Sequence, residues 1–213
     1  MMEKSGAVFL AAAMVLAGGS AAPSTWAAAS EQGGPGLVRV VVETDKGTFE
    51  VEVDTVRAPI TAGNFLRYVD GGLYDGGAFY RSVRPDTELR ADVRIQVIQG
   101  GLPRGRGRGQ GARGFGPIPL ERTSVTGLTH RDGTVSMARS APDSATSEFF
   151  ICIGDQPALD YGGARNADGQ GFAAFGRVVS GFDVVKAVHG SPVREGSENL
   201  TPPVVIGRAY RKR

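Results

Sequence analysis

Residues 37–54 alternate apolar and polar side chains in the pattern of a β-hairpin. Two runs, LVRVVVET and TFEVEVD, flank a short DKG turn. The two faces of the second run carry different residue types: Phe49, Val51 and Val53 against Glu50, Glu52 and Asp54. The pattern predicts that one face of this sheet is buried and that the other lies in water.

The period changes after the hairpin and predicts a helix over APITAGNFLRYVD, residues 58–70. Pro59 and Thr61 are start signals, apolar side chains recur at helical spacing, and two glycines follow. A second short helix is expected over FDVVKAVH, residues 182–189, closed by Gly190.

Short apolar runs elsewhere in the chain predict further strands. They occupy residues 78–83, 94–99, 133–138, 148–154, 172–179 and 203–210. With the hairpin they make about eight strands, and strands and helices do not alternate as in a parallel sheet. The sequence therefore predicts a mainly β fold, a closed eight-stranded antiparallel barrel capped by two helices.

The first thirty residues differ from the rest. GAVFLAAAMVLAGG is an apolar run of the length expected for a signal-peptide core and short for a membrane span. Small side chains at Ala27 and Ala29 permit cleavage after Ala29. We expect a signal peptide at 1–29, a polar linker at 30–36 and one domain at 37–210, in the periplasm or otherwise exported. An uncleaved anchor is the alternative; after cleavage no membrane span is expected.

An arginine- and glycine-rich stretch, QGGLPRGRGRGQGARG, occupies residues 99–114. Such repeats are typical of segments that bind single-stranded nucleic acid. The chain of 213 residues has a formal net charge of only +2, without the basic excess of most nucleic-acid proteins. We therefore expect no nucleic acid as partner, and a surface loop at 102–116. A basic rim for acidic clients or anionic surfaces, and RNA binding, are the alternatives.

The sequence lacks the residues or motifs of several common structural and catalytic sites. One cysteine, Cys152, allows no internal disulfide, and with two histidines it allows no structural zinc site. There is no Gly-x-Ser-x-Gly elbow and no phosphate-loop lysine motif. Cys152 lies in an apolar run and is expected to be buried, and His130 and His189 are interpreted as structural or solvated. We expect no metal and no cofactor.

Five segments follow one another in a specific order. They are FYRSV, IQVIQGG, GTVSMAR, DSATSEFFICIGDQPALD and FAAFGRVVSGFDVV. In this order and spacing they resemble the cyclophilin family of peptidyl-prolyl cis-trans isomerases, in particular its exported bacterial branch. The resemblance covers residues 38–205 and implies an eight-stranded antiparallel barrel with two capping helices, in agreement with the count of strands.

The resemblance also implies roles for single residues. Arg81 matches the catalytic arginine, Gln99 the glutamine that binds the substrate backbone, and Phe150 the aromatic floor of a proline pocket. The other candidate substrate-binding residues are Tyr80, Gln96, Val97, Ala138, Arg139, Glu148, Leu159 and Phe172.

Two of these positions depart from the family pattern. Gln96 replaces a pocket phenylalanine, which implies a wall that is more polar or differently closed. Glu148 replaces a glutamine that helps to place the arginine, and its carboxylate could pair with Arg81 or compete with substrate for it.

The expected function is therefore isomerisation of X-Pro bonds in exported proteins, with proline-containing polypeptides as partners and a monomer as the working form. A non-catalytic module that binds proline peptides on the same barrel is the alternative, and the arginine at position 81 argues against it.

Overall fold

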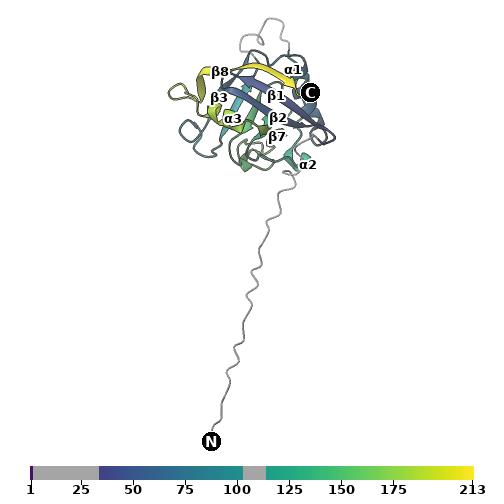
Figure 1. The fold of residues 1–213 in the computed structure, drawn as a ribbon. Helices are drawn as coiled ribbons and strands as arrows, with labels where there is room; N and C mark the ends of the chain where they lie inside the picture. The colour runs from purple at the N-terminus through teal and green to yellow at the C-terminus, as the bar shows by residue number, and fades with distance from the viewer. Residues whose placement is uncertain (2–33, 103–113) are drawn as a thin grey trace.

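The computed structural model describes residues 34–102 and 114–213, together with Met1. The predicted leader, most of the linker and most of the arginine- and glycine-rich stretch lie outside these residues. Eight strands close into an antiparallel barrel in the order β1-β2-β7-β5-β6-β4-β3-β8 (Figure 1). They are β1 (Leu37–Thr44), β2 (Gly47–Asp54), β3 (Gly77–Val83), β4 (Val97–Gly101), β5 (Thr134–Met137), β6 (Phe149–Cys152), β7 (Ala173–Ser180) and β8 (Asn199–Arg211).

The two predicted helices are present, α1 (Pro59–Asp70) and α3 (Phe182–His189). One further turn of α-helix, α2 (Thr123–Thr126), and a 3₁₀ turn, η1 (Pro157–Leu159), also form. Neither has an apolar stripe long enough to show in the sequence. The left-handed backbone of Gly127 ends α2 after a single turn.

The predicted wet face of the hairpin is wrong at two acidic positions. Glu52 is only 2% exposed, because Arg39 on β1 and Arg177 on β7 flank it, each with a nitrogen 3.7 Å from its carboxylate. Asp54 is also buried, and its carboxylate accepts the backbone N–H and the side-chain Nε–H of Arg57 at the start of α1. Alternation placed these carboxylates outside the barrel correctly, but arginines on the neighbouring strands cover Glu52, and Arg57 after β2 pairs with Asp54.

Apolar side chains gather on both sides of the barrel wall. The larger cluster fills the interior and includes Phe149 and Ile151 of β6. The smaller cluster takes the alternate residues of the same strand, Phe150 and Cys152. The two phenylalanines of β6 therefore face opposite ways, and the outer cluster provides an apolar floor outside the barrel.

Cys152 is fully buried in this outer cluster, as predicted. Burial raises the pKa of its thiol well above the usual range, so the thiolate does not form near neutral pH.

Candidate active site

Three candidate residues stand in one row across adjacent strands. Arg81 on β3 lies opposite Gln99 on β4, and Gln99 lies opposite Phe150 on β6. Residues directly opposite each other in an antiparallel sheet project from the same face. The register of three strands therefore brings an arginine, a glutamine and a phenylalanine together on the outside of the barrel.

A β-bulge in β3 adjusts this row. The register shifts between Phe79 and Arg81, so Tyr80 is an extra residue on its strand. The bulge lets both Tyr80 and Arg81 reach the same neighbour: the Gln99 amide nitrogen donates to the Tyr80 hydroxyl at 2.7 Å, and its oxygen accepts from Arg81 Nη1 at 2.9 Å.

Arg81 is anchored by a carboxylate that the sequence did not indicate. Arg81 Nε donates to Glu198 Oε2 at 2.7 Å, and Nη2 lies 2.6 Å from the same oxygen. Glu198 comes directly before β8 and is 117 residues away in the chain, so no motif links the two residues. The Glu198 side chain is 9% exposed, while that of Arg81 is 29% exposed. The guanidinium is thus held from the buried side and open on the other.

The predicted pairing of Glu148 with Arg81 needs correction. The Glu148 carboxylate accepts from the Gln99 amide nitrogen at 3.0 Å and from the Tyr80 hydroxyl. Glu148 therefore orients Gln99, and Gln99 in turn contacts Arg81. The link from Glu148 to Arg81 is indirect.

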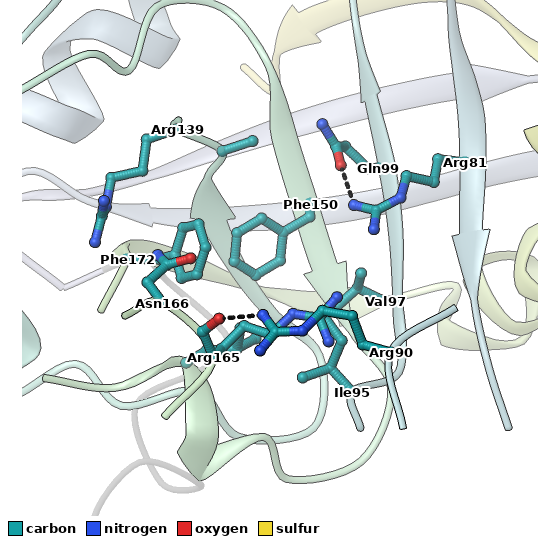
Figure 2. A pocket seen from close by; sticks show the side chains of 12 residues that line it. Arg81, Arg90, Ile95, Val97, Gln99, Arg139, Phe150, Arg165, Asn166 and Phe172 are labelled. Atoms are coloured by element: carbon teal, nitrogen blue, oxygen red, sulfur yellow. Dashed lines mark hydrogen bonds between the residues drawn. The ribbon is translucent and has the colours of Figure 1, made fainter. Parts of the chain in front are cut away.

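A cavity of about 330 Å³ opens beside this row. Phe150 forms its floor, and the ring of Phe172 meets it edge-on at a centroid distance of 5.3 Å and an angle of 87° (Figure 2). Eight of its lining residues were predicted from the sequence: Arg81, Val97, Gln99, Ala138, Arg139, Phe150, Leu159 and Phe172. The tertiary structure thus assembles one concave site from segments that span much of the chain.

The lining departs from the prediction in both directions. Tyr80, Gln96 and Glu148 are not among the described residues that line the cavity. Four residues that the sequence did not single out do line it: Arg90, Ile95, Arg165 and Asn166. Ile95 takes the wall position expected for its neighbour Gln96. Arg90 and Ile95 lie in the connection between β3 and β4, and Arg165 and Asn166 lie between η1 and β7; the sequence does not reveal which side chains of these connections line a cavity.

His130 is structural, as predicted, and it supports the floor. Its ring stacks on Phe150 with centroids 5.8 Å apart and planes 15° from parallel. Its Nδ1 lies 2.7 Å from Asp160 Oδ1, and its Nε2 lies 2.9 Å from Ser136 Oγ. Ser136 on β5 lies opposite Phe150 on β6. The imidazole is fully buried, so these contacts set the ring plane behind the phenylalanine.

His189 ends α3 in a half-buried position. Its Nε2 lies 3.0 Å from the Val83 carbonyl oxygen, and burial lowers its pKa below the usual value. It contacts the strand end rather than the cavity.

Arg139 forms another part of the wall. Its guanidinium lies over the ring of Phe172 at 5.2 Å, donates to the Gly171 carbonyl at 2.7 Å, and pairs with both oxygens of Asp168 at 2.8 and 2.9 Å. The hydrogen bond from Arg139 lowers the pKa of Asp168 to about 2. The pair therefore keeps its charge over the whole physiological pH range.

Residues 34–102 and 114–213 were compared with the requirements of a metal site and of a membrane span only through their own side chains and helices. No cluster of three His, Cys, Asp or Glu side chains there is arranged to hold a metal ion. None of the helices in this part of the chain is long and apolar enough to cross a membrane.

Comparisons with known proteins agree on one family. The family model for cyclophilin-type peptidyl-prolyl cis-trans isomerases matches residues 39–211. Peptidyl-prolyl cis-trans isomerase A of Dickeya dadantii is 35% identical over 178 residues, covering 80% of this chain and 82% of that protein. Peptidyl-prolyl cis-trans isomerase cyp18 of Streptomyces antibioticus is 35% identical over 184 residues, covering 80% of this chain and 96% of that protein.

A solved structure shares the fold. The crystal structure of a cyclophilin-type peptidyl-prolyl cis-trans isomerase from Cryptosporidium parvum superimposes with a TM-score of 0.65 at 22% sequence identity. The match covers 83% of this chain and 98% of that one.

Proposed function

This chain belongs to the cyclophilin-type peptidyl-prolyl cis-trans isomerases, and we propose that it isomerises X-Pro bonds in exported proteins by stabilising the twisted amide with Arg81. One observation carries the proposal: a guanidinium fixed from behind stands at the edge of an apolar floor. Arg81 and Phe150 line the same cavity.

The reaction needs no nucleophile. Partial double-bond character gives rotation about a peptide bond a barrier of about 18–20 kcal/mol. In the twisted transition state the proline nitrogen regains its lone pair and becomes a better hydrogen-bond acceptor. A donor placed there stabilises the transition state more than the planar ground state, and this difference is what accelerates the reaction.

Arg81 has the properties that such a donor requires. It stays protonated, and its planar fork of N–H groups is rigid. Glu198 holds Nε and Nη2, and Gln99 holds Nη1. Each of the two Nη atoms carries a second N–H, which these bonds leave for a substrate. Because the contacts exist before substrate arrives, little reorganisation is needed at the moment of rotation.

The apolar part of the cavity provides the complementary element. The proline ring lies on Phe150, between Val97, Leu159 and the Phe172 edge, and these side chains are fixed by the outer cluster. A ring held against a rigid floor keeps its nitrogen within reach of Arg81 while the preceding residue turns. Gln99 contacts the substrate backbone beside it.

The proposed location rests on the predicted leader. An apolar run before small residues at Ala27 and Ala29 supports export and cleavage after Ala29. The substrates are then exported proteins that fold after transport and whose X-Pro bonds exchange slowly without catalysis. N-terminal sequencing of protein recovered from the exported fraction tests this point: a start at Ser30 is expected, and an intact leader in the cytoplasm would contradict it.

An isomerase assay on wild type and Arg81→Ala tests the chemistry. We expect the substitution to lower kcat/KM about 100- to 1000-fold, as removal of one preorganised donor does in other sites. Arg131→Ala is the matched control, because Arg131 is 71% exposed and pairs with Asp155 away from the cavity.

The possible outcomes separate the parts of the proposal. Equal activity of Arg81→Ala and wild type would remove the arginine mechanism. If wild type and Arg81→Ala both show only the uncatalysed rate of isomerisation, the protein would be a binding module and not an enzyme.

A further inference from the structure

The cavity has an unusual charge distribution. Of the described residues that line it, four are arginines and none is acidic. The four are Arg81, Arg90, Arg139 and Arg165. The whole chain carries a formal net charge of only +2, so this concentration of guanidinium groups is local.

The carboxylates that pair with three of these arginines stand outside the cavity lining. Glu198 holds Arg81, Asp168 holds Arg139, and Glu88 holds Arg165. None of these three acids is among the described residues that line the cavity. Four guanidinium groups thus line the cavity. The partners of Arg81 and Arg165 are buried, at 9% and 2% exposed, while Asp168 is 31% exposed.

Arg90 differs from the other three. Its side chain is 42% exposed, and its partner Asp92 is 64% exposed. Its Nη1 donates to the Arg165 carbonyl oxygen at 2.5 Å, which draws the guanidinium across one end of the cavity. In the view of Figure 2, Arg90 lies on the other side of Phe150 from Gln99 and Arg81.

Arg90 also has unused donors. Three of its N–H groups bind Asp92 and the carbonyl of Arg165. A guanidinium carries five, so two have no partner among the residues that the structure describes.

The backbone that carries Arg90 is held in place. The buried Glu88 carboxylate, 2% exposed, accepts the backbone N–H of Arg90 at 3.2 Å and of Ile95 at 3.1 Å. The same carboxylate pairs with Arg165 at 3.3 Å. This ion pair joins the β3–β4 connection to the segment between η1 and β7. The contacts of Glu88 therefore hold the backbone segment that carries Arg90 in place.

We propose that the cavity selects X-Pro segments that carry a carboxylate side chain next to the proline, and that Arg90 is the residue that determines this preference. The inference rests on the proposed isomerase function and adds its substrate class. A concave site lined by charges of one sign concentrates ligands of the other sign. A guanidinium that keeps one free N–H on each Nη atom can donate to the two oxygens of Asp or Glu.

Asp92 limits the size of the effect. It already occupies part of Arg90, and a substrate carboxylate must share the guanidinium with it or displace it. Both side chains are substantially exposed, and exposed ion pairs of this kind contribute little, so exchange of one carboxylate for another is easy. The preference should also weaken at high salt.

The test compares matched peptides by NMR exchange spectroscopy, which reads isomerisation without a coupling protease. One pair places Glu or Gln directly before the proline of an otherwise uncharged peptide, and a second pair places Glu or Gln directly after it. One of the two peptide pairs places its Glu or Gln side chain against Arg90. For that pair, we expect the kcat/KM of wild type to be about three- to fivefold higher with the Glu peptide than with the Gln peptide at low salt.

Three variants locate the source of the preference. Arg90→Gln should bring the Glu-to-Gln ratio close to one, and Asp92→Asn should raise it, because it removes the competing carboxylate. Arg131→Gln removes an arginine outside the cavity and should leave the ratio unchanged.

The outcomes separate this inference from the proposed function. Catalysis of the Gln peptides with a ratio of one in both pairs would overturn the acidic preference and leave the isomerase intact. A preference that survives Arg90→Gln would overturn the assignment to Arg90. No catalysis of any peptide would instead overturn the proposed function.

Discussion

The two sides of the cavity are built in different ways. Arg81, Gln99 and Phe150 stand on neighbouring strands of a closed barrel, and backbone hydrogen bonds set their spacing. Arg90 and Arg165 stand on two connections outside the barrel, which a buried carboxylate joins. The strand side is fixed by a ladder that extends around the molecule. The connection side is fixed by a few charged contacts.

This difference suggests a division of work. Stabilising a transition state requires a donor placed to within a fraction of an ångström, and the ladder supplies that precision. Selecting a substrate side chain tolerates more movement, and connections accept new residues without disturbing the barrel. The arginine proposed for catalysis is therefore on the strand side, and the arginine proposed for selectivity is on the connection side.

The sharpest way to break the strand side is to remove the anchor of Arg81. Glu198→Ala should lower kcat/KM about ten- to hundredfold, because a catalytic group displaced by about an ångström loses that much. The loss should appear mainly in kcat, since the apolar floor proposed to bind proline stays intact. Glu195→Ala is the control, because Glu195 is exposed three residues earlier. A change in KM alone would mean that Glu198 serves binding rather than catalysis.

A different substitution, Glu88→Ala, tests the connection side. Glu88→Ala removes the acceptor of the Arg90 and Ile95 amides and the partner of Arg165. Hydrogen exchange of those two amides should accelerate about ten- to hundredfold, because hydrogen bonds to a charged group contribute about 1.5–3 kcal/mol.

Amides of the strands provide the internal control in the same spectrum. Exchange at Ile98 and Phe150 should stay close to that of wild type if the connection opens by itself. Equal acceleration at both sets of amides would show that the two sides unfold as one unit and would remove the comparison.

The smallest expected effect concerns the outer wall near Phe172. Arg139→Leu should raise the pKa of Asp168 from about 2 toward about 3.9, the ordinary value of an aspartate. A lowered pKa means that the ion pair contributes stability above the ordinary pKa and loses it as pH falls through the lowered value. An NMR titration of the Asp168 carboxyl carbon measures the shift. An unchanged midpoint would mean that the Gln170 backbone N–H, and not Arg139, sets the value.

Much of the fold was predictable because it depends on local patterns. The helix expected over residues 182–189 is observed over the same residues, and the other helix begins one residue later than expected. The hairpin forms over the predicted runs. Helical spacing, alternation and glycine at chain reversals each act within a few residues, so the sequence contains the whole signal.

The site was predictable only in part. Motif resemblance identified Arg81, Gln99 and Phe150, and the structure places them in one row. It did not identify Glu198 or Arg90, whose importance depends on what lies opposite them in space. The bulge at Tyr80 was equally hidden, because a single extra residue in a strand leaves no distinct pattern.

The sequence by itself determined the eight strands and the two longer helices, and which of their faces are apolar. Hydrophobic periodicity requires this, since burying the apolar face of each element is the main driving force. The tertiary structure decided which carboxylate holds which arginine, and that four guanidiniums meet in one cavity. Those choices depend on strand register and on contacts between distant segments, such as Arg81 and Glu198, which are 117 residues apart, and no local rule encodes them.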